Sequence, residues 1–182
     1  YSAQDLQSFL IAKADGNYEN KEAQVLGMYT GVLLHVLTER YEKEKKKAIF
    51  EFDLHKKEFN YLFYFAKRAG EVKVRNVKGH DTCSFIASYG GKAKKVLIEG
   101  NKGDYAARLA GSNGGNIRTL VINGNKGDFA AEWVGDYGKK IVTLALYKAG
   151  RYAGINAQAQ TIIKGRKALA LYKKLMAENP CV

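Results

Sequence analysis

His80, Asp81 and Cys83 form the only dense cluster of reactive side-chain types in the chain. A cysteine beside a histidine can become a nucleophilic thiolate, because the imidazole accepts the thiol proton. No Cys-x-x-Cys pair or second histidine cluster accompanies them, so the sequence predicts no metal site. Cys83 falls in the half of a repeated segment that we expect to be buried, which favours an inert, packed thiol.

Two aspartates, Asp104 and Asp128, could form a carboxylate pair, but they occupy equivalent positions of a repeat, which favours a role in capping turns. The chain has no Gly-x-x-x-x-Gly-Lys-Ser/Thr loop for a nucleotide phosphate. We therefore predict no catalytic residue, no cofactor and a protein that is not an enzyme. An enzyme that uses the His80–Cys83 region is the second alternative.

The middle of the chain is an internal repeat. Val-Leu-Ile-Glu-Gly-Asn-Lys-Gly-Asp-Tyr-Ala-Ala at 96–107 returns as Leu-Val-Ile-Asn-Gly-Asn-Lys-Gly-Asp-Phe-Ala-Ala at 120–131, so the period is 24. Apolar residues at i and i+2 predict a short strand at the start of each unit. The same register places five such pairs in line: Ala48 and Phe50, Val72 and Val74, Val96 and Ile98, Leu120 and Ile122, Leu144 and Leu146. A fixed period of this length indicates a solenoid.

The second half of each unit is ambiguous. Phe129, Trp133 and Tyr137 have helical spacing, and Asp128 could cap a short helix, yet the same segment could be another strand. We predict an α+β fold: a short β-solenoid, right-handed β-helix-like, capped by helices at both ends. The alternative is a strand–helix solenoid like a leucine-rich repeat, because Ile117, Leu120, Ile122 and Asn125 fit that spacing.

Residues 70–145 resemble a known repeat. Gly100, Gly103 and Asp104, followed by Gly114-Gly115-Asn116-Ile117, match the Gly-x-x-Gly-x-x-x-Gly pattern, with Ala107 in place of the third glycine. This string is similar to the repeats of right-handed β-helix domains. Such domains occur at the C-terminus of the glutamate synthase large subunit and in one subunit of formylmethanofuran dehydrogenase. The resemblance implies a structural platform without catalytic residues.

The chain divides into three segments of one compact unit: residues 1–70, a helical N-terminal cap with one strand; residues 71–150, the repeat solenoid; and residues 151–182, a basic C-terminal helix. Within the cap we expect a helix at 21–47 and a second helix at 55–68. The first would have an apolar stripe of Tyr29, Val32, Leu33, Val36 and Leu37. A helix at 157–178 would cover the other end of the solenoid.

The net charge of +12 is uneven: the three segments carry net charges of +1, +6 and +5. Such asymmetry is typical of a protein with an anionic partner. Lys78, Lys102 and Lys126 share one position of the repeat and would stack as a ladder about 5 Å apart. Asp104 and Asp128 stand two residues on, so the ladder could be neutralised by them or could face phosphates.

The sequence therefore predicts a non-enzymatic binding or scaffold protein that contacts an anionic partner, either an acidic protein subunit or nucleic acid. A nucleic-acid-binding protein proper is the first alternative. The candidate anion-binding residues are Lys78, Lys102, Lys126, Lys92, Lys94, Lys95, Arg118, Lys139, Lys140, Lys164, Arg166, Lys167, Lys173 and Lys174.

The sequence also bears on location. No apolar run is long enough to span a bilayer, and the first residues lack the basic and apolar regions of a signal peptide. Two cysteines, Cys83 and Cys181, do not make a disulfide framework, which favours a reducing compartment. We expect a cytoplasmic protein without a membrane partner.

Overall fold

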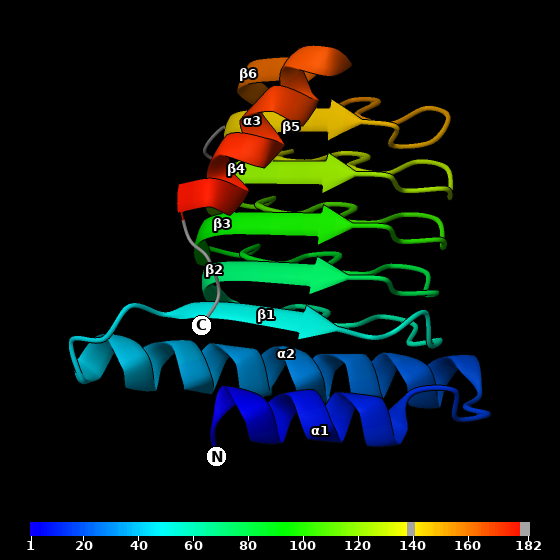
Figure 1. Ribbon diagram of the computed structural model, residues 1–182, viewed down its shortest axis with the longest axis vertical. Helices are drawn as coiled ribbons and strands as arrows, with labels where there is room; N and C mark the ends of the chain where they lie inside the picture. Colours follow the sequence, from blue (N-terminus) through cyan, green and yellow to red (C-terminus); the bar gives the residue numbers. More distant parts are fainter. Residues whose placement is uncertain (138–140, 179–182) are drawn as a thin grey trace.

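The protein is a β-solenoid with helices at its N- and C-termini, as the predicted fold class has it (Figure 1). The computed structural model describes residues 1–137 and 141–178. One six-stranded parallel sheet runs through it, and its strands follow the order of the sequence. The strands are β1 (Ile49–Asp53), β2 (Arg68–Arg75), β3 (Lys92–Glu99), β4 (Asn116–Asn123), β5 (Ile141–Tyr147) and β6 (Ala159–Lys164).

The register of the sheet confirms the period of the sequence repeat between β2 and β5. Val72 pairs with Val96, Val96 with Leu120, and Leu120 with Leu144. The turns at the two ends are shorter than this period, because Phe50 pairs with Val72 and Leu144 pairs with Ile162. The expected alignment of Ala48 with Val72 is therefore wrong by two residues, and Phe50 and Phe52 are the inward pair of β1.

The second half of each turn is neither helix nor strand. It is a chain of turns in which every second residue is left-handed, as at Asp81, Cys83, Phe85, Ala87 and Tyr89, with φ between 53° and 58°. The predicted helix at 55–68 is wrong for this reason, since residues 61–65 adopt the same conformation and no residue from 55 to 68 is helical. The leucine-rich-repeat alternative is also wrong, because no described residue between β1 and β6 is helical.

Main-chain hydrogen bonds satisfy this unusual segment. In the enclosed turns, each left-handed residue donates its N–H to a neighbouring turn, alternately forward, as Phe85 does to Arg108 O, and backward, as Ala87 does to Ala66 O. The residues between them donate three residues back, as Ser88 does to Phe85 O. Buried backbone groups must be paired, so this network replaces a second sheet on that side of the coil.

The left-handed positions also restrict side-chain type. Side chains alternate two inward and two outward, and each inward pair has a right-handed and a left-handed member. Ile86 and Val134 are right-handed members, while their left-handed neighbours are Ala87 and Gly135. No described left-handed residue is Val, Ile or Thr, because branching at Cβ makes positive φ costly.

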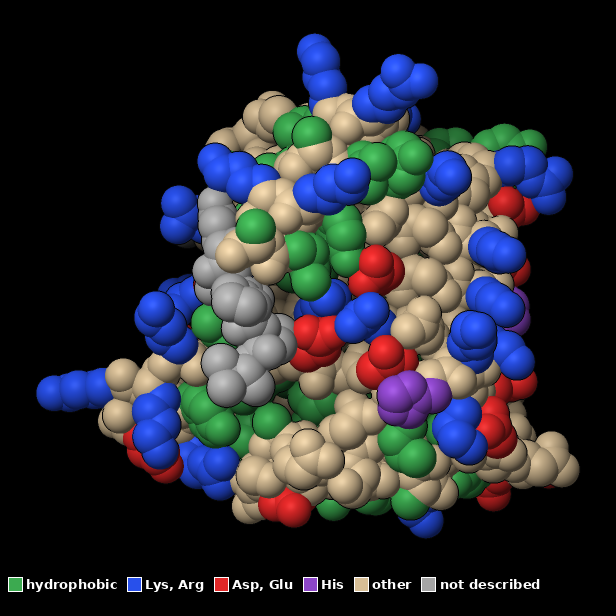
Figure 2. Space-filling view, viewed as in Figure 1, with side chains coloured by type: hydrophobic (Ala, Val, Ile, Leu, Met, Phe, Trp, Pro, Cys, Tyr) green, Lys and Arg blue, Asp and Glu red, His purple; other side chains and the backbone are tan. Residues whose placement is uncertain are grey.

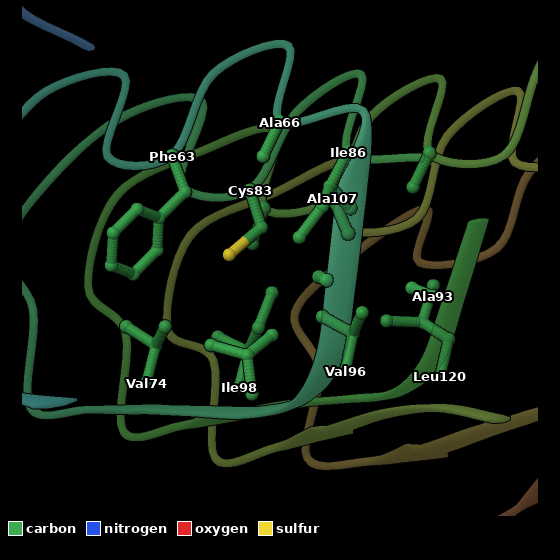
Figure 3. Close-up of a cluster of buried hydrophobic side chains, with 14 of the residues drawn as sticks. Phe63, Ala66, Val74, Cys83, Ile86, Ala93, Val96, Ile98, Ala107 and Leu120 are labelled. Atoms are coloured by element: carbon green, nitrogen blue, oxygen red, sulfur yellow. The ribbon is translucent and has the colours of Figure 1, made fainter. Parts of the chain in front are cut away.

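The core tapers along the solenoid axis. Large aromatic residues fill the first turns, among them Phe52, Phe59 and Phe63, whereas opposite the sheet the later turns present small residues such as Ala107 and Ala131. Figure 3 shows one cross-section, in which Phe63, Cys83 and Ala107 face Val74 and Ile98 of the sheet. These residues form one continuous apolar core inside the coil.

Helices α1 (Ala3–Lys13) and α2 (Asn20–Lys43) cover the β1 end. The sequence patterns did not predict α1. Only part of the expected stripe of α2 faces the core: Leu33 and Leu37 pack there, whereas Tyr29, Val32 and Val36 are exposed. Helix α2 also contacts the first turn through small residues. A Cβ at Gly27 or Gly31 would overlap the carbonyl oxygens of Tyr61 and Tyr64.

Helix α3 (Arg166–Glu178) packs on the outer face of the sheet, against Leu97, Val121 and Ala145 (Figure 1). The first part of the predicted helix at 157–178 is β6 instead. Burial, together with a hydrogen bond with Glu99 of β3, raises the pKa of Tyr172. The inward face of β6 is left open, because Ile162 is 44% exposed although its partner Leu144 is fully buried.

Substitutions at one inward pair test the alternation of backbone conformation. Ala106 and Ala107 are both fully buried, but only Ala107 is left-handed, with φ 57°. Each change to glycine removes the same methyl group. We expect Ala106→Gly to destabilise the fold by about 1 kcal/mol, and Ala107→Gly to be nearly neutral because glycine relieves about 1 kcal/mol of left-handed strain. Chemical denaturation of both variants measures the difference, and equal losses would contradict the alternation.

Candidate functional site

The predicted His80–Asp81–Cys83 cluster does not assemble. The Cys83 side chain points into the core among apolar neighbours (Figure 3), and burial raises the pKa of its thiol to about 12. His80 is exposed on the outer surface, where its Nδ1 accepts a hydrogen bond from Asp104 N. Asp81 forms an ion pair of 3.1 Å with Arg108. The imidazole and the thiol therefore lack the contact that nucleophilic catalysis requires.

The carboxylates of Asp104 and Asp128 join successive turns. Asp104 Oδ1 accepts a hydrogen bond of 2.7 Å from Asp128 N, and Asp128 Oδ1 accepts one from Arg151 N. Asn60 does the same for His80 N in an earlier turn. Hydrogen bonds from Arg151 lower the pKa of Asp128. This column of side chains caps main-chain donors at the corner that follows each strand.

The lysine ladder is present at that corner but is not neutralised by the aspartates. Lys78, Lys102 and Lys126 are exposed on consecutive turns. None of the described ion pairs joins these three lysines to Asp104 or Asp128, whose oxygens bind main-chain N–H groups, His80 or Arg151. Their ammonium groups are available to a ligand, although acidic side chains lie among them.

A second set of cations lies at the opposite corner, where the strands begin. Lys92, Lys94, Arg68 and Arg118 line a hollow of about 230 Å³ whose only acidic lining residue is Glu42. A neighbouring hollow of about 330 Å³ adds Lys67 and Tyr89 and shares Arg68 and Lys92. We call the two hollows together the basic groove. Figure 2 shows Lys and Arg side chains gathered at both edges of the sheet face, with acidic groups mixed among them on the right.

Most cations of the groove are free of acidic partners. Arg68 pairs with Glu39 and Glu42 of α2, at 3.1 and 3.3 Å. Lys92, Lys94 and Arg118 are exposed, and no ion pair of the described chain includes them. The parallel register explains the clustering, since Arg68 pairs with Lys92 and Lys92 with Asn116. Charges from three turns therefore converge at one place.

The remaining predicted residues lie elsewhere. Lys95 is on the outer face of the sheet, where it forms an ion pair of 3.0 Å with Glu71. A group of exposed cations follows the last strand and α3: Lys164, Arg166, Lys167, Lys173 and Lys174. Lys139 and Lys140 lie outside the described residues. The structure thus separates the predicted anion-binding residues into the lysine ladder, the basic groove and the C-terminal group.

The sequence interpretation missed three residues of the groove: Lys67, Arg68 and Tyr89. They flank the strands rather than recur in the best copies of the repeat. The sequence repeat could have identified Arg68, because Arg68 stands one full period before Lys92 and pairs with it in the sheet. Tyr89 had no such signal, although its ring is 53% exposed beside the groove.

Comparison with known proteins found no family model that matches the chain, and no match among curated proteins or solved structures. Within residues 1–137 and 141–178, no helix has the length and apolar character needed to cross a bilayer. The same residues contain no group of three or more His, Cys, Asp or Glu side chains that could hold a metal ion.

The burial of Cys83 has a direct chemical consequence. In a Cys181→Ser variant, we expect Cys83 not to react with a disulfide reagent in mildly alkaline buffer, because the thiolate does not form at a pKa of about 12. Full reaction is expected once the protein is unfolded in guanidinium chloride. Release of the coloured thiolate product measures both states. Rapid modification of the native protein would contradict the buried position.

The Asp128–Arg151 contact predicts a weak dependence of stability on acid pH. The folded-state pKa of Asp128 is lowered below the ordinary value of 3.8, chiefly by the Arg151 side chain. Its contribution is therefore fully present above that value and is lost as the pH falls through the lower folded-state pKa. We expect Asp128→Asn to flatten this acid limb in thermal unfolding. Glu132→Gln, in the same turn, is the control and should leave the limb unchanged.

Proposed function

We propose that the protein is a non-enzymatic binding protein whose basic groove holds a polyanion. The observation that supports the proposal is the convergence of Arg68, Lys92, Lys94 and Arg118 from successive turns on a hollow with a single acidic lining residue, Glu42. The strands fix the backbone positions of these cations, so binding costs the rotamer freedom of their side chains but requires no ordering of the main chain. Anionic groups that repeat along a chain can meet a cation on each turn.

The proposal assigns binding to the groove and not to the positive charge of the protein as a whole. The lysine ladder has an equal number of free cations, but Asp104 and Asp128 stand beside it and reduce its positive potential. Among the residues that the structure describes, the acidic neighbours of the groove are those that hold Arg68, Glu39 and Glu42. The binding role also agrees with the platform function implied by the resemblance to β-helix domains. A cytoplasmic location is part of the same proposal, because Cys83 is a buried free thiol.

Two substitution sets of equal charge test the proposal. The groove set is Lys92→Gln, Lys94→Gln and Arg118→Gln, and the matched control is Lys78→Gln, Lys102→Gln and Lys126→Gln. We expect the groove set to weaken binding of heparin and of labelled oligothymidylate by about tenfold or more, and to lower the salt slope for the oligonucleotide by about 2. The control set should have a much smaller effect. Equal losses in both sets, or no loss in either, would overturn the proposal.

Nucleic acid is the second candidate because an exposed aromatic ring, Tyr89, lies beside the cations. Bases stack on such rings, whereas an acidic polypeptide has no comparable group. We expect Tyr89→Ala to weaken oligonucleotide binding by about 1–3 kcal/mol, with Tyr89→Phe close to the unchanged protein. Fluorescence anisotropy with oligothymidylate and with polyglutamate as separate probes makes the comparison. Loss of both ligands, or of neither, would contradict a nucleic-acid partner and leave the acidic protein subunit.

A further inference from the structure

The two ends of the solenoid are finished differently. Helices α1 and α2 cover the β1 end, and Leu6, Leu10, Leu34 and Leu37 of these helices belong to its core. At the other end, no described strand lies on the outer edge of β6. Ile162 and Ile155 are 44% and 40% exposed there, although Ile162 occupies the column of Leu144. The apolar core is therefore open to solvent at the β6 end.

Main-chain donors are also left over at this end. In the turn below, Phe129 N donates to Arg151 O and Trp133 N donates to Ile155 O. The equivalent donors of the last turn are the N–H groups of Tyr152 and Asn156, both left-handed residues. Neither donates a hydrogen bond to any described residue. Among the described residues, the last turn thus lacks a partner on both sides of the coil, and its β6 edge is a template for one more extended chain.

The positive charge at the β6 end indicates which kind of extended chain can bind there. Residues 137–177 contain nine Lys and Arg residues and no Asp or Glu. Lys164, Arg166 and Lys167 are exposed at the end of β6 and the start of α3. Figure 2 shows blue and green side chains, cationic and apolar, at the top of the view. A second copy of this chain, docked end to end, would bring cations against cations, and like charges in contact are unfavourable.

We propose that the β6 end binds an extended, acidic segment of a partner protein, which adds as a seventh strand beside β6. Strand addition satisfies main-chain groups that a helix could not reach. The alternate side chains of the added strand would be apolar on the Ile162 side, because that side faces the core. Its acidic side chains, on the other face of the strand, would meet Arg166 and Lys167 at the start of α3. This site is separate from the basic groove, so either proposal can fail without the other.

Two labelled decapeptides of alternating sequence, one of Glu and Val and one of Lys and Val, serve as probes. We expect the Glu–Val peptide to bind in fluorescence anisotropy and the Lys–Val peptide not to bind. The Glu–Val peptide with N-methyl groups on alternate residues should lose at least about tenfold in affinity, because it cannot pair with an edge. Undiminished affinity of the methylated peptide would mean that charge alone causes binding, and would overturn the proposal.

The variant Ile162→Lys supplies the matched test on the protein side. It adds a positive charge, so attraction alone predicts stronger binding of the Glu–Val peptide, whereas loss of the apolar contact at the edge predicts binding at least about tenfold weaker. Ile162→Val should bind as the unchanged protein does. Since Ile162 is partly exposed, thermal unfolding should confirm that both variants fold.

Three outcomes would overturn the proposal. The first is that neither peptide binds. The second is that the Glu–Val peptide responds to the groove set and not to Ile162→Lys. The third is dimerisation in sedimentation velocity that Ile162→Lys abolishes while no peptide binds, since a second copy would then be the occupant.

Discussion

Main-chain hydrogen bonds between successive turns hold the solenoid on both sides of the coil. On one side they are the bonds of a parallel sheet, and on the other they run alternately forward and backward from left-handed residues. Both sets of hydrogen bonds can form only if equivalent residues of successive turns lie one above the other. The length of the turn is therefore fixed where it is enclosed, from β2 to β5, and varies only in the first and last turns.

Columns of like side chains follow from this constraint. The lysine ladder and the aspartate caps are each one position of the repeat, read along the axis. The basic groove combines two positions, Arg68 with Lys92 and Lys94 with Arg118. The same constraint decides which charges are free. Lys73 is almost completely buried between Glu51 and Glu99 on the outer face of the sheet, and Arg75, Arg108 and Arg151 also pair with acids. A net charge counted from the sequence includes these structural cations.

The sequence was sufficient for β2 to β5 and their register, because alternation and period depend only on residue type and spacing. It was insufficient for the other side of the coil. A pattern of two inward and two outward residues repeats every four positions, close to the 3.6 of a helix, so the spacing of Phe59, Phe63 and Ala66 fits both. The face of α2 was misread for another reason. The close approach of main chains requires glycine at 27 and 31, and a hydropathy pattern does not show this requirement. The groove could not be predicted because its residues come together only when neighbouring turns are superposed.

The division of the inward pairs into right- and left-handed members affects how the chain can change in evolution. An alanine codon is one nucleotide away from codons for Val, Thr, Pro, Ser, Gly, Asp and Glu. At Ala107 and Ala131 the positive φ excludes Val, Thr and Pro, and burial excludes the two acids. Single mutations there can lead only to Ser or Gly. At Ala106 and Ala130, one residue earlier, Val and Thr face no such backbone barrier. Adjacent alanines of one motif therefore accept different sets of single-nucleotide substitutions, because the sign of φ differs between them.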